Sequence, residues 1–330
     1  MRRNLLVLLS LLCLALIGAA VALPELFWPY SGKVVVDGAM RTRTISRLLA
    51  ELNEHYVFPD TAKRMETLIR KRQQDGAYDM IVNGEQFAAQ LTADLASVAH
   101  DRHMKVKFSL KPMRSDRALE AVAFAGSPAV PNRKHGVDNV DHLGPAIGYL
   151  RISSFPPPAL VAKTYASAMD KLSDTGALII DVRNNRGGSP ESVALLVSYF
   201  VERRTRLNDI WSRDSGIMRQ TWTEDRLDGK RYGGKKPVLI LAGPGTASAG
   251  EDFTYTMQAL KRATVIGEPT WGGAHPVTFY RLGEHFFAAI PNSRSISPIT
   301  LTNWEGSGVT PDVATPPANA LAVAKDLLQR

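Results

Sequence analysis

The chain has 330 residues and a formal net charge of +8, and with 45% hydrophobic and 22% charged residues its composition is ordinary for a soluble globular protein. This length accommodates one large core and a smaller domain. The single cysteine, Cys13, lies in an N-terminal apolar run, which excludes disulfides, thiol chemistry and thiolate metal sites from the rest of the chain.

The first 22 residues have the pattern of an export signal. Arg2 and Arg3 precede an uncharged run over residues 5–23, which ends in the small-x-small cleavage pattern Ala-Val-Ala at 20–22. The run is also long enough to span a bilayer as an uncleaved anchor. We therefore expect the body of the chain in the periplasm or cell envelope, with membrane association through residues 1–22 left open. A nucleic-acid partner fits poorly with export.

Residues 40–110 predict a small N-terminal helical domain. Ile45, Leu48 and Leu52 share one helical face, and residues 62–74 and 87–98 continue the helical pattern. Residues 111–143 are rich in Pro, Gly, Asp, Asn and Arg, which is typical of an exposed connector.

Residues 144–330 alternate apolar strand patterns with helical patterns. We expect strands at 147–152, 177–182, 238–241 and 263–266, and helices at 159–172, 189–201, 248–261 and 319–328. This alternation predicts an α/β domain with a mainly parallel sheet, whose active groups lie at the carboxyl ends of its strands.

Ser248 occupies the most informative position in this domain. It follows the predicted strand at 238–241 and the turn residues Gly243, Pro244 and Gly245, and it stands at the start of a helix. The first amides of a helix have no intrahelical acceptor, so the Ala249 N–H is available to a negative charge developing on a carbonyl under attack. This arrangement suits a nucleophilic serine.

A structural interpretation competes with the catalytic one, because Ser248 and Glu251 also form the Ser-x-x-Glu pattern of a capping box.

Nucleotide binding is not supported, since no Gly-x-x-x-x-Gly-Lys-Ser/Thr motif occurs. A Gly-x-Ser-x-Gly elbow is excluded because Thr246 stands where that motif needs glycine.

A second strand-to-helix turn contains Gly187 and Gly188. Glycine leaves backbone amides unobstructed, so one of these two N–H groups is a candidate second donor beside Ala249, and two donors make an oxyanion hole. A tight turn that needs glycine only for its backbone angles explains the pair equally well.

Three ordered blocks resemble the tail-specific, or C-terminal processing, serine peptidases: LIIDVRNNRGG at 178–188, TASAGE at 246–251 and KRATVIGE at 261–268. The motifs YVFP at 56–59 and DRHM at 101–104 are similar to the branch that contains the repeats of interphotoreceptor retinoid-binding protein. The resemblance covers roughly residues 40–318. It implies an α/β core of the ClpP/crotonase type with a small N-terminal helical bundle, a nucleophile at Ser248, and oxyanion donors from Ala249 and the Gly187/Gly188 turn.

The chain departs from the better-known branch of this family at the general base. That branch has a lysine 25 residues after the serine, whereas this chain has Gly273 there. A serine hydroxyl needs a neighbouring base, and histidine is the side chain that most often has this role near neutral pH. By the resemblance we expect His103 to be the base and Glu305, just before Gly-Val-Thr-Pro-Asp at 308–312, to orient it. His275 is the second choice as base, because it is near Ser248 in sequence and lies in a glycine-rich loop. A surface or hydrogen-bonded histidine and a loop carboxylate are the simpler explanations.

Together these features predict an exported serine peptidase that acts on peptides or proteins through an acyl-enzyme, without cofactor or metal. The alternative is a noncatalytic module that binds or carries apolar ligands on the same fold. Residues 111–143 are too few for the PDZ insertion of the Ser–Lys members, so substrate selection needs another surface. The sequence leaves the oligomeric state open.

Overall fold

The computed structural model describes residues 34–119 and 136–329. The expected export segment, residues 1–22, lies outside this part of the chain. Within the described residues, no helix combines the length and apolar character needed to cross a bilayer.

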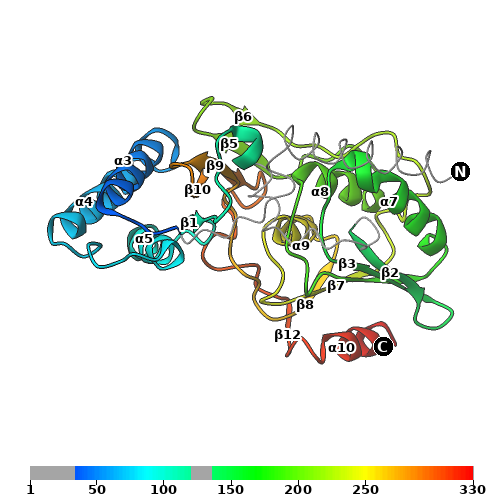
Figure 1. Cartoon of the computed structure of the whole chain (residues 1–330). Helices are drawn as coiled ribbons and strands as arrows, with labels where there is room; N and C mark the ends of the chain where they lie inside the picture. Colours follow the sequence, from blue (N-terminus) through cyan, green and yellow to red (C-terminus); the bar gives the residue numbers. More distant parts are fainter. Residues whose placement is uncertain (1–33, 120–135, 330) are drawn as a thin grey trace, which may run out of the picture.

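The N-terminal part is helical, as predicted, with α3 (Gly38–His55), α4 (Pro59–Gln74) and α5 (Gly84–Ala99) packed side by side (Figure 1). Two of these helices begin at side-chain caps: Asp37 accepts from the Met40 amide and Asn83 accepts from the Gln86 amide. In α4, proline occupies the first helical turn, where its missing N–H costs nothing.

The helices do not form a closed domain by themselves. Strand β1 (Lys105–Phe108) pairs antiparallel with β10 (Phe286–Pro291), and β10 pairs antiparallel with β9 (Val277–Arg281). Phe286, Ala288 and Ile290 of β10 belong to the same buried cluster as the helical core residues, and the Phe286 ring meets Phe87 edge to face. The helical domain predicted over residues 40–110 is therefore completed by strands almost two hundred positions later in the chain.

The second part is a six-stranded sheet in the order β12-β8-β7-β4-β3-β2. All neighbours run parallel except β2, which is antiparallel to β3. The strands are β2 (Val137–His142), β3 (Ile147–Ile152), β4 (Ala177–Asp181), β7 (Val238–Ala242), β8 (Thr264–Gly267) and β12 (Val313–Ala314).

Helices cover both faces of this sheet, because its strands bury side chains on each side (Figure 1). On one face Leu178 and Ile180 pack with residues of α7 (Pro158–Leu172), α8 (Pro190–Val197) and α9 (Ala249–Ala259). On the other face Ile179 packs with α10 (Ala320–Gln329). The predicted α/β class with an N-terminal helical bundle is confirmed.

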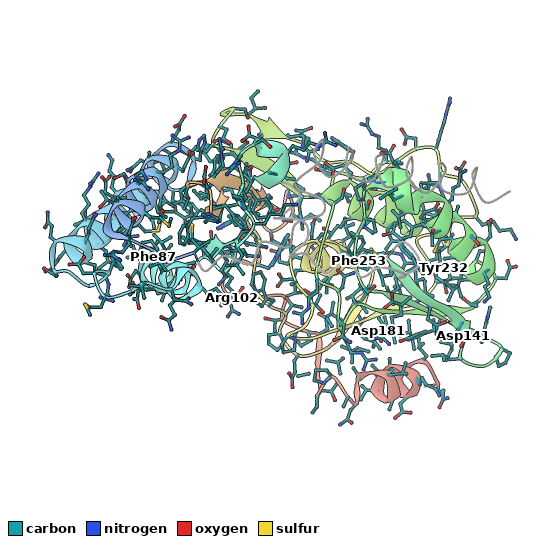
Figure 2. All side chains as sticks on the ribbon, in the orientation of Figure 1. Phe87, Arg102, Asp141, Asp181, Tyr232 and Phe253 are labelled. Atoms are coloured by element: carbon teal, nitrogen blue, oxygen red, sulfur yellow. The ribbon has the colours of Figure 1, made fainter. Side chains whose placement is uncertain are left out.

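A third small sheet, β11-β5-β6, lies between these two parts in the view of Figure 1. It consists of β5 (Asp209–Ser212), β6 (Met218–Arg219) and β11 (Ser293–Ile296), and a short 3-10 helix (Ser198–Phe200) follows α8. Figure 2 shows Phe87 among the N-terminal helices and Phe253 inside the second part, with Arg102 between them.

The structure moves one expected boundary. Residues 137–142, at the end of the expected connector 111–143, form strand β2 and belong to the large sheet. The sequence of β2 lacks the alternation of apolar and polar residues expected of a strand, because Asp138, Asn139 and Asp141 are polar. As an edge strand, β2 buries few of its side chains. The second part therefore starts at about residue 137 instead of 144.

Candidate active site

Ser248 lies at the turn between β7 and α9, and its backbone is unusual. Its φ and ψ are 53° and −120°, whereas the helix-capping residues Asp37, Asn83 and Ser189 all have extended backbones. The Ser248 amide donates to the Glu251 carboxylate, as in one half of a capping box, but the Ser248 side chain makes no capping hydrogen bond. A residue that only caps a helix has no need of a positive φ, and strain of this kind is concentrated at functional positions.

The Ser248 turn packs directly against the Gly187–Gly188 turn. Strands β4 and β7 are parallel neighbours, so both turns leave the same edge of the sheet. The Ala247 amide donates to the Asn185 carbonyl at 2.8 Å, and the Thr246 hydroxyl donates to the Val182 carbonyl at 2.8 Å. A Cβ on Gly245 would lie 2.4 Å from the Arg183 carbonyl oxygen, so only glycine permits this approach.

Gly187 and Gly188 differ in what their amides do. Both have positive φ, 98° and 141°. The Gly187 amide donates to the buried Asn185 side chain at 2.9 Å, whereas the amides of Gly188 and Ala249 have no acceptor among the residues that the structure describes. A Cβ on Gly187 would lie 2.7 Å from Ser248 Cβ and 3.0 Å from the Ala249 nitrogen, so the glycine turn abuts the serine.

The Glu251 carboxylate connects Ser248 to the loop that follows β8. It is completely buried and accepts hydrogen bonds from the Ser248 amide at 2.8 Å, the Thr270 hydroxyl at 2.6 Å, the Gly272 amide at 2.5 Å and the Gly273 amide at 2.9 Å. Burial raises its pKa, and these four donors oppose that effect. Glu251 is thus a structural link as well as a helix-start carboxylate.

Ser248 opens into a cavity of about 1280 Å³ between the two parts of the molecule. Its lining includes five of the residues singled out in the sequence: Ser248, Ala249, Gly188, His103 and His275. Glu305 instead lines a smaller cavity of about 390 Å³, which it shares with Asp101 and His275.

The His103 imidazole lies beside Gly273. A Cβ on Gly273 would be 2.6 Å from His103 Cε1 and 2.4 Å from the Trp271 ring, which meets the imidazole edge to face. His103 Nδ1 is buried without a hydrogen-bond partner in the described part of the chain, and the His103 amide donates to Asp101 Oδ1 at 3.1 Å. Burial lowers the pKa of His103 to about 4.

His275 is held between two carboxylates. Its Nδ1 lies 2.7 Å from Asp101 Oδ2 and 3.5 Å from Glu305 Oε2. Glu305 Oε2 also accepts from the Ala274 amide at 2.5 Å, and burial, followed by the nearby Asp101 charge, raises the pKa of Glu305. The sequence analysis named Asp101 only as part of the DRHM block and gave it no role in the site. Its position two residues before His103 was the one feature of the sequence that could have indicated such a role.

Asp101, His103 and Glu305 present ligand atoms within 4.8 Å of one another, a donor set that a divalent cation accepts. The His275 Nδ1 lies 2.7 Å from the Asp101 carboxylate and 3.5 Å from the Glu305 carboxylate, and it donates to them in the tautomer that carries the proton on Nδ1. We therefore interpret the cluster as a hydrogen-bonded imidazole–carboxylate group.

Comparisons with known proteins agree with this architecture. A model described as peptidase family S41 matches residues 146–315, and a model described as the N-terminal domain of Peptidase_S41 in eukaryotic IRBP matches residues 39–139.

Two curated relatives are the chloroplastic carboxyl-terminal-processing peptidase 2 of Arabidopsis thaliana and the carboxyl-terminal-processing protease of Synechocystis sp. The first is 28% identical over 52% of this chain and 32% of its own length, and the second is 29% identical over 43% and 31%. The chain thus spans about a third of the length of these relatives. A putative peptidase from Parabacteroides merdae has a similar fold, with a TM-score of 0.64 at 18% identity, over 88% of this chain and 97% of its own.

We expect Glu251→Gln to destabilise the protein by about 2–4 kcal/mol, because an amide NH₂ cannot accept the hydrogen bonds that one carboxylate oxygen accepts here. Chemical denaturation of the two proteins measures the difference. Glu191→Gln is the matched control: Glu191 also lies in the first turn of a helix, but it is largely exposed and should change stability little. Equal effects of the two substitutions would contradict the linking role.

Proposed function

This chain belongs to peptidase family S41, and we propose that it is a serine peptidase that hydrolyses peptides or proteins through an acyl-enzyme on Ser248. The observation that supports this proposal is that Ser248, whose backbone is strained, lines one cavity with His103 and with Gly188 and Ala249, whose amides have no acceptor within residues 34–119 and 136–329. The Ser248 hydroxyl attacks the substrate carbonyl, the amine product leaves, and water then hydrolyses the ester.

We assign the general base to His103. Gly273 stands where other members have the lysine, and the His103 ring fills the space that a side chain at this position would need. The Nδ1 atom is enclosed, so proton transfer is assigned to Nε2. A low pKa keeps the imidazole neutral at pH 7, which leaves it free to accept the serine proton but makes it a weaker base than an imidazole whose pKa is near 7.

Asp101 is assigned to stabilise the imidazolium that forms during the reaction, because its charge favours protonated His103, and Glu305 is assigned to support it at longer range, since neither carboxylate hydrogen-bonds to His103 Nδ1 in the described part of the chain. A carboxylate oxygen of each residue lies within 4.8 Å of a His103 ring nitrogen. His275 fixes these carboxylates through its Nδ1, which makes it a positioning residue in this scheme and the second choice as base.

The oxyanion donors are assigned to the amides of Ala249 and Gly188. Gly187 is not assigned as a donor, because its amide already donates to the Asn185 side chain. Its role is to let the turn pack against Ser248, since it has no Cβ. Each such donor contributes on the order of 10²–10³ to the rate of acyl transfer.

The cavity wall argues against the alternative of a carrier for apolar ligands. Arg43, Arg47, Glu51 and Asp116 line it together with apolar residues such as Val277, Phe279 and Trp304. A wall that carries both kinds of side chain suits a peptide better than a purely apolar ligand.

Export is proposed from the sequence of residues 1–22. If the signal is cleaved after the Ala-Val-Ala pattern, N-terminal sequencing of protein from the cell envelope or periplasm will start at Leu23. Protein that begins at Met1 and stays in the membrane fraction would instead indicate an uncleaved anchor, and protein in the cytoplasm would contradict export.

A fluorophosphonate probe should label the wild-type protein, and Ser248→Ala should abolish this labelling because the attacking oxygen is gone. His103→Ala should lower the labelling rate on the order of 10²–10⁴-fold through loss of the base. In-gel fluorescence of folded protein gives both rates, and circular dichroism verifies folding.

His142→Ala is the control for removal of a histidine, since His142 is exposed on β2, outside the cavity lining, and should leave labelling unchanged. Absence of labelling in the folded wild type would refute the nucleophile. If His275→Ala abolishes labelling and His103→Ala labels normally, the base is His275 and the assignment to His103 is wrong.

The low pKa of His103 also predicts the pH dependence of hydrolysis. The neutral imidazole is the active form, so kcat/KM should fall as the pH drops through the pKa of the folded protein, near 4, and should change little between pH 7 and 5.5. Initial rates on fluorescent casein across this range test this expectation. An acid limb centred near 6.5 would mean that the base is not this buried imidazole.

A further inference from the structure

Three metal-ligating side chains lie together at the end of helix α3. Glu51, Glu54 and His55 each supply one ligand atom to this cluster, and the three atoms lie within 4.8 Å of one another. His55 Nε2 is 3.3 Å from Glu51 Oε2 and 3.8 Å from Glu54 Oε2. Two ligands that each lie about 2.1 Å from a tetrahedral ion are about 3.4 Å apart, so the spacing around His55 fits one ion.

The Glu51 carboxylate is buried but incompletely paired. The residue is only 4% exposed. Its Oε1 atom lies 2.6 Å from the Arg47 guanidinium, whereas Oε2 accepts no hydrogen bond from a residue that the structure describes and faces the His55 ring instead. The buried Glu251 carboxylate, by contrast, accepts four hydrogen bonds. A buried carboxylate oxygen without a donor is costly unless a cation meets it.

The His55 ring is held so that Nε2 faces the two glutamates. Its Nδ1 lies 2.8 Å from Asp214 Oδ1, and the ring stacks on Tyr280 with centroids 4.3 Å apart. Asp214 is fixed in turn, because its Oδ2 accepts from Asn292 Nδ2 at 2.6 Å. The carboxylate can only accept, so Nδ1 carries the proton, and in the neutral ring Nε2 keeps its lone pair. A carboxylate commonly orients metal-binding histidines in this way.

Two guanidinium groups lie close to the cluster, and neither contacts all of its ligand atoms. Arg47 is 61% exposed and contacts Oε1 of Glu51, the oxygen that does not face His55. Arg213 donates to two backbone carbonyls near the end of α3. The space between the three ligand atoms is therefore left to another cation. A protonated His55 is the alternative to a metal ion, and measurements of metal binding separate the two.

We propose that Glu51, Glu54 and His55 bind one divalent transition-metal ion of the zinc kind, with Asp214 as the positioning residue of the imidazole. Carboxylate and imidazole ligands suit this class of ion, and three protein ligands leave a fourth position for water or for an oxygen of a bound molecule. Glu51 and His55 line the cavity that contains Ser248, so the ion lies in the cavity wall. The site departs from the expectation of a protein without metal, and it does not depend on the peptidase function.

Metal binding to the full chain, freed of metal by a chelator, tests the site. One Co²⁺ ion per chain should bind and give the visible absorption of a tetrahedral ion, and Zn²⁺ should displace it. His55→Ala and Glu51→Gln should each weaken Zn²⁺ binding by more than about 100-fold in competition with a chromogenic chelator, while His142→Ala binds as the wild type does. Circular dichroism verifies folding. A folded wild type that gives no Co²⁺ spectrum would overturn the inference and leave His55 as an imidazolium.

Further substitutions separate a metal site from a cluster of ion pairs. Asp214→Ala should weaken Zn²⁺ binding about 10–100-fold, and Asp214→Asn, whose amide oxygen still accepts from Nδ1, should restore part of it. Arg47→Gln should strengthen binding several-fold, because it removes a competing cation from Glu51. Glu54→Gln changes a side chain that is 74% exposed, so it should weaken binding about 10-fold without lowering the melting temperature. Unchanged affinity in both Asp214→Ala and Glu54→Gln would refute the assigned ligands.

The cluster of Asp101, His103 and Glu305 is the competing location for an ion. His103→Ala should leave the affinity for Zn²⁺ unchanged. If His103→Ala abolishes binding and His55→Ala binds normally, the ion belongs to the catalytic group and the assignment to α3 is wrong. Metal binding by a protein that fluorophosphonate fails to label would count against the peptidase function alone, and labelling without metal binding would count against the metal site alone.

Discussion

The Glu251 carboxylate is the constraint on which the candidate site depends. A buried carboxylate is stable only when hydrogen-bond donors surround it, and here the donors come from the serine turn and from the loop after β8. Satisfying one buried charge therefore fixes Ser248 relative to Gly273, and Gly273 marks the position of the His103 ring. The placement of nucleophile and proposed base follows from this electrostatic requirement.

The sheet supplies the second half of the arrangement. Because β4 and β7 are parallel neighbours, their carboxyl ends bring two turns to the same edge, and glycine at 187 and 245 lets the backbones touch. The strain at Ser248 is supported by this packing, which holds the amides of Gly188 and Ala249 on one side of the cavity. Rigid elements thus position a site that would be imprecise on isolated loops.

The N-terminal helices contribute chemistry as well as stability. Asp101 and His103 follow α5 and reach the core because β1 pairs with β10, so the two parts share a sheet and an apolar cluster. One packing arrangement therefore brings the proposed base to the cavity that Ser248 lines.

Much of this could be predicted from the sequence, because the patterns involved are local. Helical periodicity, buried strands and the Ser-x-x-Glu and Gly-Gly turns indicated the α/β class and the candidates Ser248, Ala249 and the Gly187–Gly188 pair, without deciding between the two glycines. Polar or half-buried strands such as β2 and β9 have no such periodicity and were not predicted.

Only the tertiary structure decided three hydrogen bonds of the site. The Gly187 amide donates to the Asn185 side chain, the Gly273 amide donates to Glu251, and His275 is hydrogen-bonded to Asp101. Some of these hydrogen bonds join residues far apart in the chain, and others depend on which of several possible acceptors a buried donor uses. Such bonds form only after the fold has brought the groups together, so the local sequence does not specify them.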